Sequence, residues 1–162
     1  MIKSKLEISY NSCSIDELTE EERLLVERAR EATRNSFAPY SNFHVGAALM
    51  LKNGKVIIGA NQENSAFPSG LCAERTAVFT AQANYPEQPI MMLAIAAADS
   101  NGLRSKPVSP CGACGQVILQ IESRYHQQVE ILLSGTKSIL RFKSIKDLMP
   151  FSFVDDDLMP EQ

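Results

Sequence analysis

Residues 71–83 read LCAERTAVFTAQA, and from Cys72 onward this stretch predicts a helix of about three turns. Alanine, valine and phenylalanine recur in it at helical spacing, and neither glycine nor proline interrupts them. Cys72 falls in the expected first turn, where the positive end of a helix dipole stabilises a thiolate. The start of this helix is therefore the first candidate for chemistry.

Two elements are expected before this helix. Residues 19–37 have helical spacing, and Thr19 followed by Glu22 is typical of a helix N-terminus. Residues 43–51 and 55–60 indicate two strands joined as a hairpin by a tight turn. The turn residues expected to take positive φ angles are Asn53 and Gly54.

Further elements are expected after it. Residues 90–98 are continuously apolar, which favours a central strand covered on both faces. Pro110 suits the first position of a helix that continues over residues 111–125. Residues 129–134 and 138–142 look like strands, and their joint is too short for a parallel crossover. These last two strands are therefore expected to be antiparallel.

The order αββαβαββ predicts a three-layer α/β/α fold: a five-stranded mixed sheet with helices on both faces. A short further helix is expected around residues 143–149. We assign residues 16–153 to one domain, residues 1–15 to a mixed N-terminal tail and residues 154–162 to an acidic C-terminal tail.

Composition limits the classes of function. With 162 residues, 44% hydrophobic side chains and a formal charge of −3, the chain suits one compact domain. We find neither a secretion signal nor an apolar run long enough to cross a bilayer, so we expect a cytoplasmic protein without a membrane partner. The acidic balance disfavours nucleic acid and favours a small-molecule substrate.

Three of the four cysteines are expected to share a metal ion. Cys111 and Cys114 lie three residues apart near the positive end of one helix, and Cys72 has the same place on another. In a reducing compartment such cysteines favour metal or redox chemistry over disulfides. Three thiolates suit one Zn²⁺ per subunit and leave one coordination position open, as in catalytic zinc sites. Cys13 is expected to be a tail thiol.

Glu74 is the candidate catalytic residue. Residues two apart on a helix point about 200° from one another, so Glu74 is poorly placed to bind the same ion as Cys72. A carboxylate beside zinc-bound water can instead accept its proton and pass it to a substrate. The sequence therefore predicts a proton carrier next to the metal.

CAER at 72–75 and PCGACGQV at 110–117 resemble the two zinc motifs of the cytidine deaminases in their short, three-cysteine form. The resemblance extends from about Ala38 to Phe153. It implies a zinc enzyme that hydrolyses cytidine and deoxycytidine to uridine and deoxyuridine and releases ammonia in pyrimidine salvage, with Glu74 as the proton shuttle.

The resemblance also covers segments that contact substrate in the family. APYSNFHVGAAL at 38–49 resembles the first of these, which places Phe43 beside the nucleoside. NQEN at 61–64 resembles the ribose-binding loop, in which Asn61 and Glu63 would hydrogen-bond the sugar hydroxyls. A carboxylate acceptor favours a neutral sugar over a phosphate, and hence nucleosides over nucleotides.

DLMPFSF at 147–153 resembles a family segment whose last aromatic reaches a neighbouring subunit. Phe153 would then stack on the base in that subunit's site, which implies a homotetramer with shared active sites. Ala73 is expected at the substrate because it is small. The resemblance also places Phe67 near a subunit boundary, and a substrate role and an ordinary core position suit it equally well.

The chain departs from the family at Gly115, where relatives commonly carry an arginine. Three thiolates leave a zinc site with net negative charge, which makes a bound water less acidic. Arg75 is retained and is expected to tune the zinc by donating hydrogen bonds to sulfur. The departure bears on the rate more than on the identity of the reaction.

Other interpretations remain open for the same residues. Cys111 and Cys114 alone would suit a redox pair. A fourth ligand from His44, His126 or Cys13 would make the zinc structural and the chain a noncatalytic zinc-binding module. Within the enzyme class, the alternative substrate is another cytosine-nucleoside-like compound.

Overall fold

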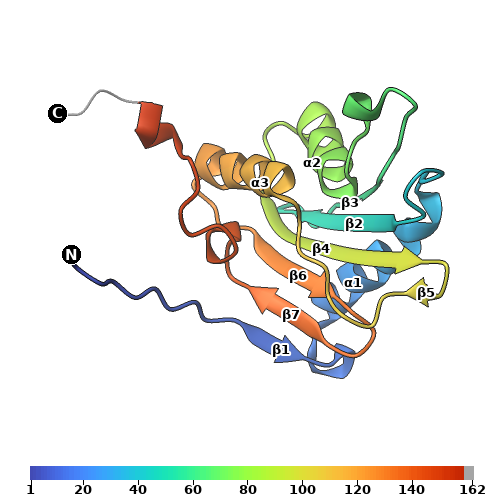
Figure 1. The fold of residues 1–162 in the computed structure, drawn as a ribbon, viewed down its shortest axis with the longest axis horizontal. Coiled ribbons are helices and arrows are strands. Elements are labelled where there is room, and N and C mark those ends of the chain that lie inside the picture. Colours follow the sequence, from blue (N-terminus) through green and yellow to red (C-terminus); the bar gives the residue numbers. More distant parts are fainter. Residues whose placement is uncertain (159–162) are drawn as a thin grey trace.

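A mixed sheet with helices on both faces forms the body of the molecule (Figure 1). The computed structural model describes residues 1–158. Its helices are α1 (Glu20–Ala32), α2 (Ala73–Asn84) and α3 (Gly112–Tyr125). Its strands are β1 (Asn11–Cys13), β2 (His44–Leu51), β3 (Val56–Ala60), β4 (Ile90–Asp99), β5 (Gly102–Leu103), β6 (Glu130–Ser134) and β7 (Ile139–Phe142).

The strands form one seven-stranded sheet in the order β1-β7-β6-β4-β2-β3, with β5 paired to the end of β4. The β6–β7 pair is antiparallel, as predicted. The β4–β6 pair is parallel, so the sheet is mixed. The predicted number of five strands is wrong. β1 has three residues and β5 has two, so neither is long enough to show alternation, and each forms by pairing with a longer strand.

Alternating side chains of the central strands supply a core on each face of the sheet. Leu49 and Leu51 of β2 pack in the cluster that includes α2 and α3, whereas Ala48 and Met50 pack in the cluster that includes α1. Figure 1 shows α2 and α3 on one face of the sheet and α1 on the other. The three-layer α/β/α architecture is therefore confirmed.

Helix α1 begins as its sequence predicts. The backbone N–H of Glu22 donates to Thr19 Oγ1 at 3.3 Å, and the Glu22 carboxylate accepts the Thr19 N–H at 2.8 Å. The helix is shorter than the predicted range, because it tightens into a 3₁₀ turn at Thr33–Asn35. Glu22 also forms an ion pair with Arg141 on β7, with 2.7 Å between Oε1 and Nη2, which ties the helix start to the sheet.

The β2–β3 turn differs from the prediction at one residue. Gly54 has a φ of 80°, whereas Asn53 is not among the described residues with positive φ. The side chain of Asn53 instead accepts the backbone N–H of Lys55 at 3.1 Å. A side chain that satisfies the backbone in this way stabilises the turn with one left-handed residue rather than two.

Two predictions near the C-terminus also need correction. Pro110 does not occupy the first helical position, because Cys111 is the N-cap and α3 begins at Gly112. The short helix expected around residues 143–149 is a 3₁₀ turn at Ile145–Asp147. Of the predicted acidic tail, residues 159–162 lie outside the described part of the chain.

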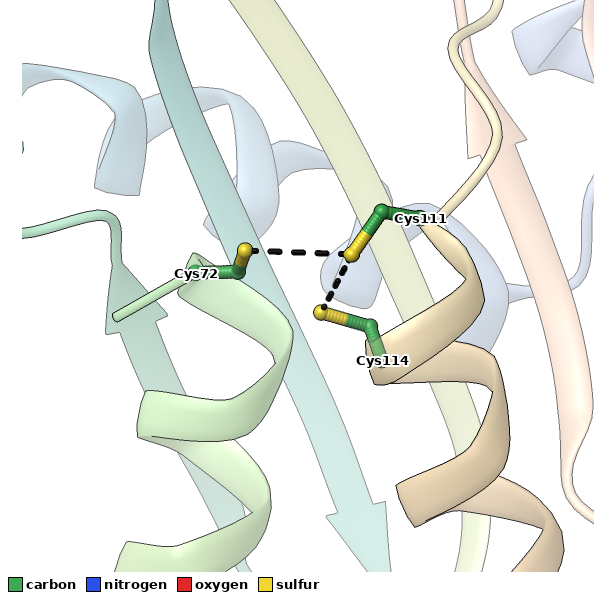
Figure 2. Close-up of side chains that lie close together, drawn as sticks. All are labelled: Cys72, Cys111 and Cys114. Carbon is green, nitrogen blue, oxygen red and sulfur yellow. Dashed lines mark hydrogen bonds between the residues drawn. The ribbon is translucent and has the colours of Figure 1, made fainter. Parts of the chain in front are cut away.

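Helices α2 and α3 lie side by side and start at the same end of the sheet (Figures 1 and 2). Gly59 on β3 allows α2 to approach closely, since a Cβ there would lie 2.3 Å from the Ala73 carbonyl oxygen. Toward the other end of the helices, Arg124 donates to Gln82 at 2.9 Å. The fold thereby brings two helix N-termini to one place.

Candidate active site

Three cysteines meet where α2 and α3 begin. Cys72 is the N-cap of α2, Cys111 is the N-cap of α3, and Cys114 lies in the first turn of α3. Their sulfurs all lie within 4.8 Å of one another. The Sγ atoms of Cys72 and Cys111 are 4.0 Å apart, and those of Cys111 and Cys114 are 3.5 Å apart (Figure 2). Residues far apart in the sequence thus form one sulfur cluster.

The cluster fits one tetrahedral zinc ion. Zn–S bonds of about 2.3 Å at tetrahedral angles place coordinated sulfurs about 3.8 Å apart, between the two distances above. Burial raises the pKa of the Cys114 thiol, and the charge of Glu74 raises it further. Burial also raises the pKa of Cys111, but hydrogen bonds from Cys114 and Cys72 outweigh it, so the net pKa is lowered. A divalent cation would offset the charge of such clustered thiolates.

Glu74 lies beside this cluster on the first turn of α2 and is only 5% exposed. Burial raises the pKa of its carboxyl group, against opposing effects of its own backbone N–H, the Cys114 thiol and Arg75. Within residues 1–158, the group of side chains close enough to share an ion contains the three cysteines and no carboxylate. Glu74 is therefore placed next to a metal-binding group without belonging to it.

Arg75 contacts the cluster directly. Its Nη2 donates to Cys72 Sγ at 3.6 Å. Hydrogen bonds to the sulfurs of Cys72 and then Cys114 raise the pKa of the guanidinium, although burial opposes them. A cationic donor against sulfur stabilises the thiolate that a metal ion binds. Arg75 is thus a positively charged hydrogen-bond donor to the cluster.

The residues considered as a fourth ligand lie elsewhere. His44 Nδ1 is 2.5 Å from Ser36 Oγ, and Cys13 Sγ is 3.7 Å from the Ile139 carbonyl oxygen. His126 is the C-cap at the far end of α3. In the part of the chain that the structure describes, none of these side chains joins the cysteine group. The geometry therefore favours an open coordination position over a structural zinc site.

The NQEN loop runs beside the metal-binding end of α2. Gln62 and Leu71 exchange two backbone hydrogen bonds of 2.9 Å, which fix the loop just before Cys72. Asn61 Oδ1 accepts the backbone N–H of Val45 at 2.7 Å. Its Nδ2 donates to the carbonyl oxygen of Phe43 at 2.9 Å. Asn61 thus joins the loop to the start of β2 and holds the backbone of the half-buried Phe43.

Glu63 organises the neighbouring APYSN turn. Its carboxylate accepts the backbone N–H groups of Tyr40 at 2.8 Å and Ser41 at 3.2 Å, and also the Ser41 hydroxyl. The bond from that hydroxyl is the main cause of the lowered pKa of Glu63. A hollow of about 340 Å³ opens here between Glu63, Tyr40 and Phe67. Phe67 is 73% exposed, so it is not a core residue.

The C-terminal segment is held along α3. Gln116 donates to the carbonyl oxygen of Phe153 at 2.9 Å. One helical turn and two turns further on, Gln120 and Ser123 donate to the Asp155 carboxylate at 3.1 and 2.9 Å. Phe153 is 56% exposed, so its ring is accessible to another molecule. Ala73, in contrast, is fully buried at the start of α2.

Gly115 forms a further contact between α3 and the C-terminal segment. It is buried, and a Cβ at this position would lie 2.1 Å from Sδ of Met149. The absence of a side chain therefore allows Met149 to pack directly on the helix backbone. Met149 therefore occupies the space that a side chain at position 115 would need.

The sequence model of the cytidine and deoxycytidylate deaminase zinc-binding region matches residues 19–128. The chain belongs to the cytidine deaminase family. It is accordingly an enzyme of the hydrolase class, and Zn²⁺ is its cofactor. The matched range contains the cysteine cluster and Glu74. Among the residues that the structure describes, no helix is long and apolar enough to cross a membrane.

Proteins that are similar to this chain over most of its length are named cytidine deaminases. A cytidine deaminase of Halalkalibacterium halodurans is 36% identical over 84% of this chain and 96% of its own length. One from Sporosarcina psychrophila is 37% identical over 83% of this chain and 92% of its own. The crystal structure of a cytidine deaminase from Burkholderia pseudomallei matches with a TM-score of 0.70 and 36% identity. That match covers 84% of this chain and 100% of the other.

Sequence reasoning did not find every residue that shapes the site. It overlooked Ser41, whose hydroxyl and backbone hold Glu63, and Tyr40, whose ring meets that of Phe67 edge to face at 5.3 Å. The turn-forming letters of APYSN were a signal for the first, because such turns leave backbone donors for a nearby acceptor. Met149 carried no comparable signal, since its contact with Gly115 arises only from the fold.

Proposed function

We propose that this enzyme hydrolyses cytidine and deoxycytidine to uridine and deoxyuridine in pyrimidine salvage. In this reaction the oxygen of water becomes attached to C4 of the pyrimidine, the bond from C4 to the amino nitrogen breaks, and ammonia leaves. One observation carries the proposal: a buried carboxyl group, Glu74, lies beside three sulfurs spaced for a single zinc ion. Such a pair suits hydrolytic deamination.

In this proposal Cys72, Cys111 and Cys114 hold the Zn²⁺, which when bound makes water a better nucleophile at neutral pH. Glu74 accepts a proton from the attacking water, delivers it to N3 of the base and later protonates the departing amine. Burial raises the pKa of Glu74, which favours the first step of that cycle, the uptake of a proton from the water. Arg75 stabilises the sulfur ligands.

We assign substrate binding to the loops around this centre. Phe43 would pack beside the nucleoside, and Asn61 and Glu63 would hydrogen-bond the sugar hydroxyls. In support, the backbone bonds between Gln62 and Leu71 hold the loop that carries these two residues close to the start of α2. We also assign Ala73 to this site because it is small, although its side chain is fully buried.

We further propose a homotetramer in which subunits share active sites. Phe153 would complete the neighbouring subunit's site by stacking on the base. Its exposed ring and the hydrogen bonds that fix its segment along α3 support a role outside its own subunit. Neither nucleic acid nor a membrane is among the proposed partners, and we expect the enzyme in the cytoplasm.

Incubation of the zinc-loaded enzyme with cytidine tests the proposal. We expect uridine and ammonia in equal amounts, with deoxycytidine also consumed and free cytosine a poor substrate, because it lacks the sugar. Failure of both nucleosides, with turnover of another cytosine-nucleoside-like compound, would refute the substrate assignment. The Glu63→Gln variant should raise KM for cytidine more than it lowers kcat, whereas Glu27→Gln on the exposed face of α1 should change neither.

A further inference from the structure

Residues 1–10, here termed the N-terminal arm, extend away from the sheet before β1 begins (Figure 1). Within residues 1–158, no backbone hydrogen bond joins residues 1–9 to another segment. Ile2, Leu6 and Ile8 are 94%, 54% and 43% exposed. The arm therefore presents unpaired backbone groups together with apolar side chains, the two features that favour pairing with another strand.

The arm has the side-chain pattern of a strand. Its even positions from 2 to 10 are Ile2, Ser4, Leu6, Ile8 and Tyr10, while the odd positions between them are all polar. The ring of Tyr10 stacks on Phe142 of β7 at 5.3 Å, directly after the register of the β1–β7 pair. Phe142 belongs to the core on the α2 and α3 face. The apolar side of the arm thus continues that face of the sheet beyond its edge.

We propose that the arm pairs antiparallel with the arm of a second copy of this chain, with Leu6 of one copy opposite Leu6 of the other. In this register Tyr10 lies opposite the second copy's Ile2 and Ile8 lies opposite its Ser4, so that the apolar side chains of both copies gather on one face. On the other face Lys5 lies opposite the second copy's Glu7, and this contact occurs twice because the pair is symmetric. Opposite charges in facing positions stabilise a strand pair.

The apolar pattern and the charges of the arm favour this register over the registers shifted by one or two residues. A shift of the pairing by one residue places Leu6 opposite Lys5 or Glu7. The apolar side chains of one arm would then lie on the same face as the polar side chains of the other. If one arm slides by two residues along the other, Lys5 lies opposite the second copy's Lys5 for one direction of the shift. For the other direction, Glu7 lies opposite the second copy's Glu7. Like charges in facing positions are destabilising. Within one chain Lys5 and Glu7 form an ion pair with each other, and their side chains are 81% and 76% exposed, so both remain accessible to a partner that would exchange this pair for two pairs between copies.

A cysteine at the symmetry axis tests the pairing, which does not depend on the proposed catalytic activity. Facing residues in an antiparallel pair have Cα atoms about 4.5–5.5 Å apart, within the range for a disulfide. We would place Leu6→Cys and, as a control, Ile2→Cys in a Cys13→Ser background. In the proposed register the two copies of residue 2 are about 27 Å apart, because they are separated by eight residue steps.

Both zinc-loaded variants would be oxidised with oxidised glutathione, quenched with an alkylating agent and separated on a non-reducing gel. We expect Leu6→Cys to form covalent dimers about tenfold faster than Ile2→Cys, because paired thiols have a high effective concentration. Equal rates would overturn the proposal. In the Leu6→Cys protein, Lys5→Glu should slow dimer formation and adding Glu7→Lys should restore it, whereas an unchanged rate or a failure to restore it would also overturn the register.

Discussion

Replacing Gly115 with alanine would bring the added Cβ to 2.1 Å from Met149 Sδ unless the methionine moves. Ordinary contact between such atoms needs about 3.5–4.0 Å, so the Met149 side chain must retreat by about 1.5 Å or more. Met149 is half-buried and methionine is adaptable, which keeps the loss near the lower end for overpacked sites, about 1–2 kcal/mol of unfolding free energy. For a domain of this size, that loss lowers Tm by about 2–8 °C.

The sign of the same substitution should reverse once Met149 is shortened. In a Met149→Ala background the added Cβ meets no sulfur, and alanine then stabilises the interior of α3 by about 0.5–1 kcal/mol relative to glycine. Gly112→Ala in the first turn of the same helix is the matched control, because a Cβ there meets no atom within 4 Å. That variant should not lower Tm in either background.

Thermal unfolding of the zinc-loaded variants measures these effects as a double-mutant cycle. The expected result is a fall in Tm for Gly115→Ala alone and a rise for the same change in the Met149→Ala protein. A fall of equal size in both backgrounds would refute the argument that Gly115 is required by its contact with Met149. The contact would then have no part in holding the C-terminal segment on α3.

Three further predictions concern the site and the fold. Glu74→Gln should retain one zinc per subunit while kcat falls about 10³-fold or more, with Glu27→Gln as the unaffected control; near-normal turnover would remove Glu74 from the mechanism. Cys114→Ser should lower the zinc content measured by atomic absorption, whereas Cys13→Ser should leave it at one per chain; equal zinc contents would contradict the ligand assignment. Thr19→Ala should lower the unfolding free energy in urea by about 1 kcal/mol through loss of the α1 cap, and no change would show that this cap contributes nothing.

Local sequence signals predicted the parts of the fold that depend on neighbouring residues. The reciprocal hydrogen bonds of Thr19 and Glu22 follow from their spacing of three residues. The antiparallel β6–β7 pair follows from the short joint between the two strands. The two cysteine motifs also indicated helix starts, and the structure has Cys72 and Cys111 as N-caps. Each of these features is set within a few residues of chain, where propensity and capping decide.

Features that arise from distant contacts had no such signal. Strand β1 forms because β7 offers it an edge, and its three residues are too few to show a period. Gly115 indicated only a departure from the family, and the methionine that explains it comes from residue 149, on a different segment. The Asn53 side chain accepts a hydrogen bond from the backbone N–H of Lys55, and only Gly54 of the Asn53–Gly54 pair has a positive φ. The rule that both residues of an Asn-Gly turn take positive φ does not include this alternative.

X-ray absorption at the zinc edge of the loaded enzyme tests most directly whether three cysteines hold a metal with one position left open. We expect three sulfur neighbours at about 2.3 Å and one lighter atom that is exchangeable with solvent or an added ligand. Four sulfur neighbours, or a histidine in the fourth position, would contradict it, because no place would then remain at the metal for the water that Glu74 is proposed to deprotonate.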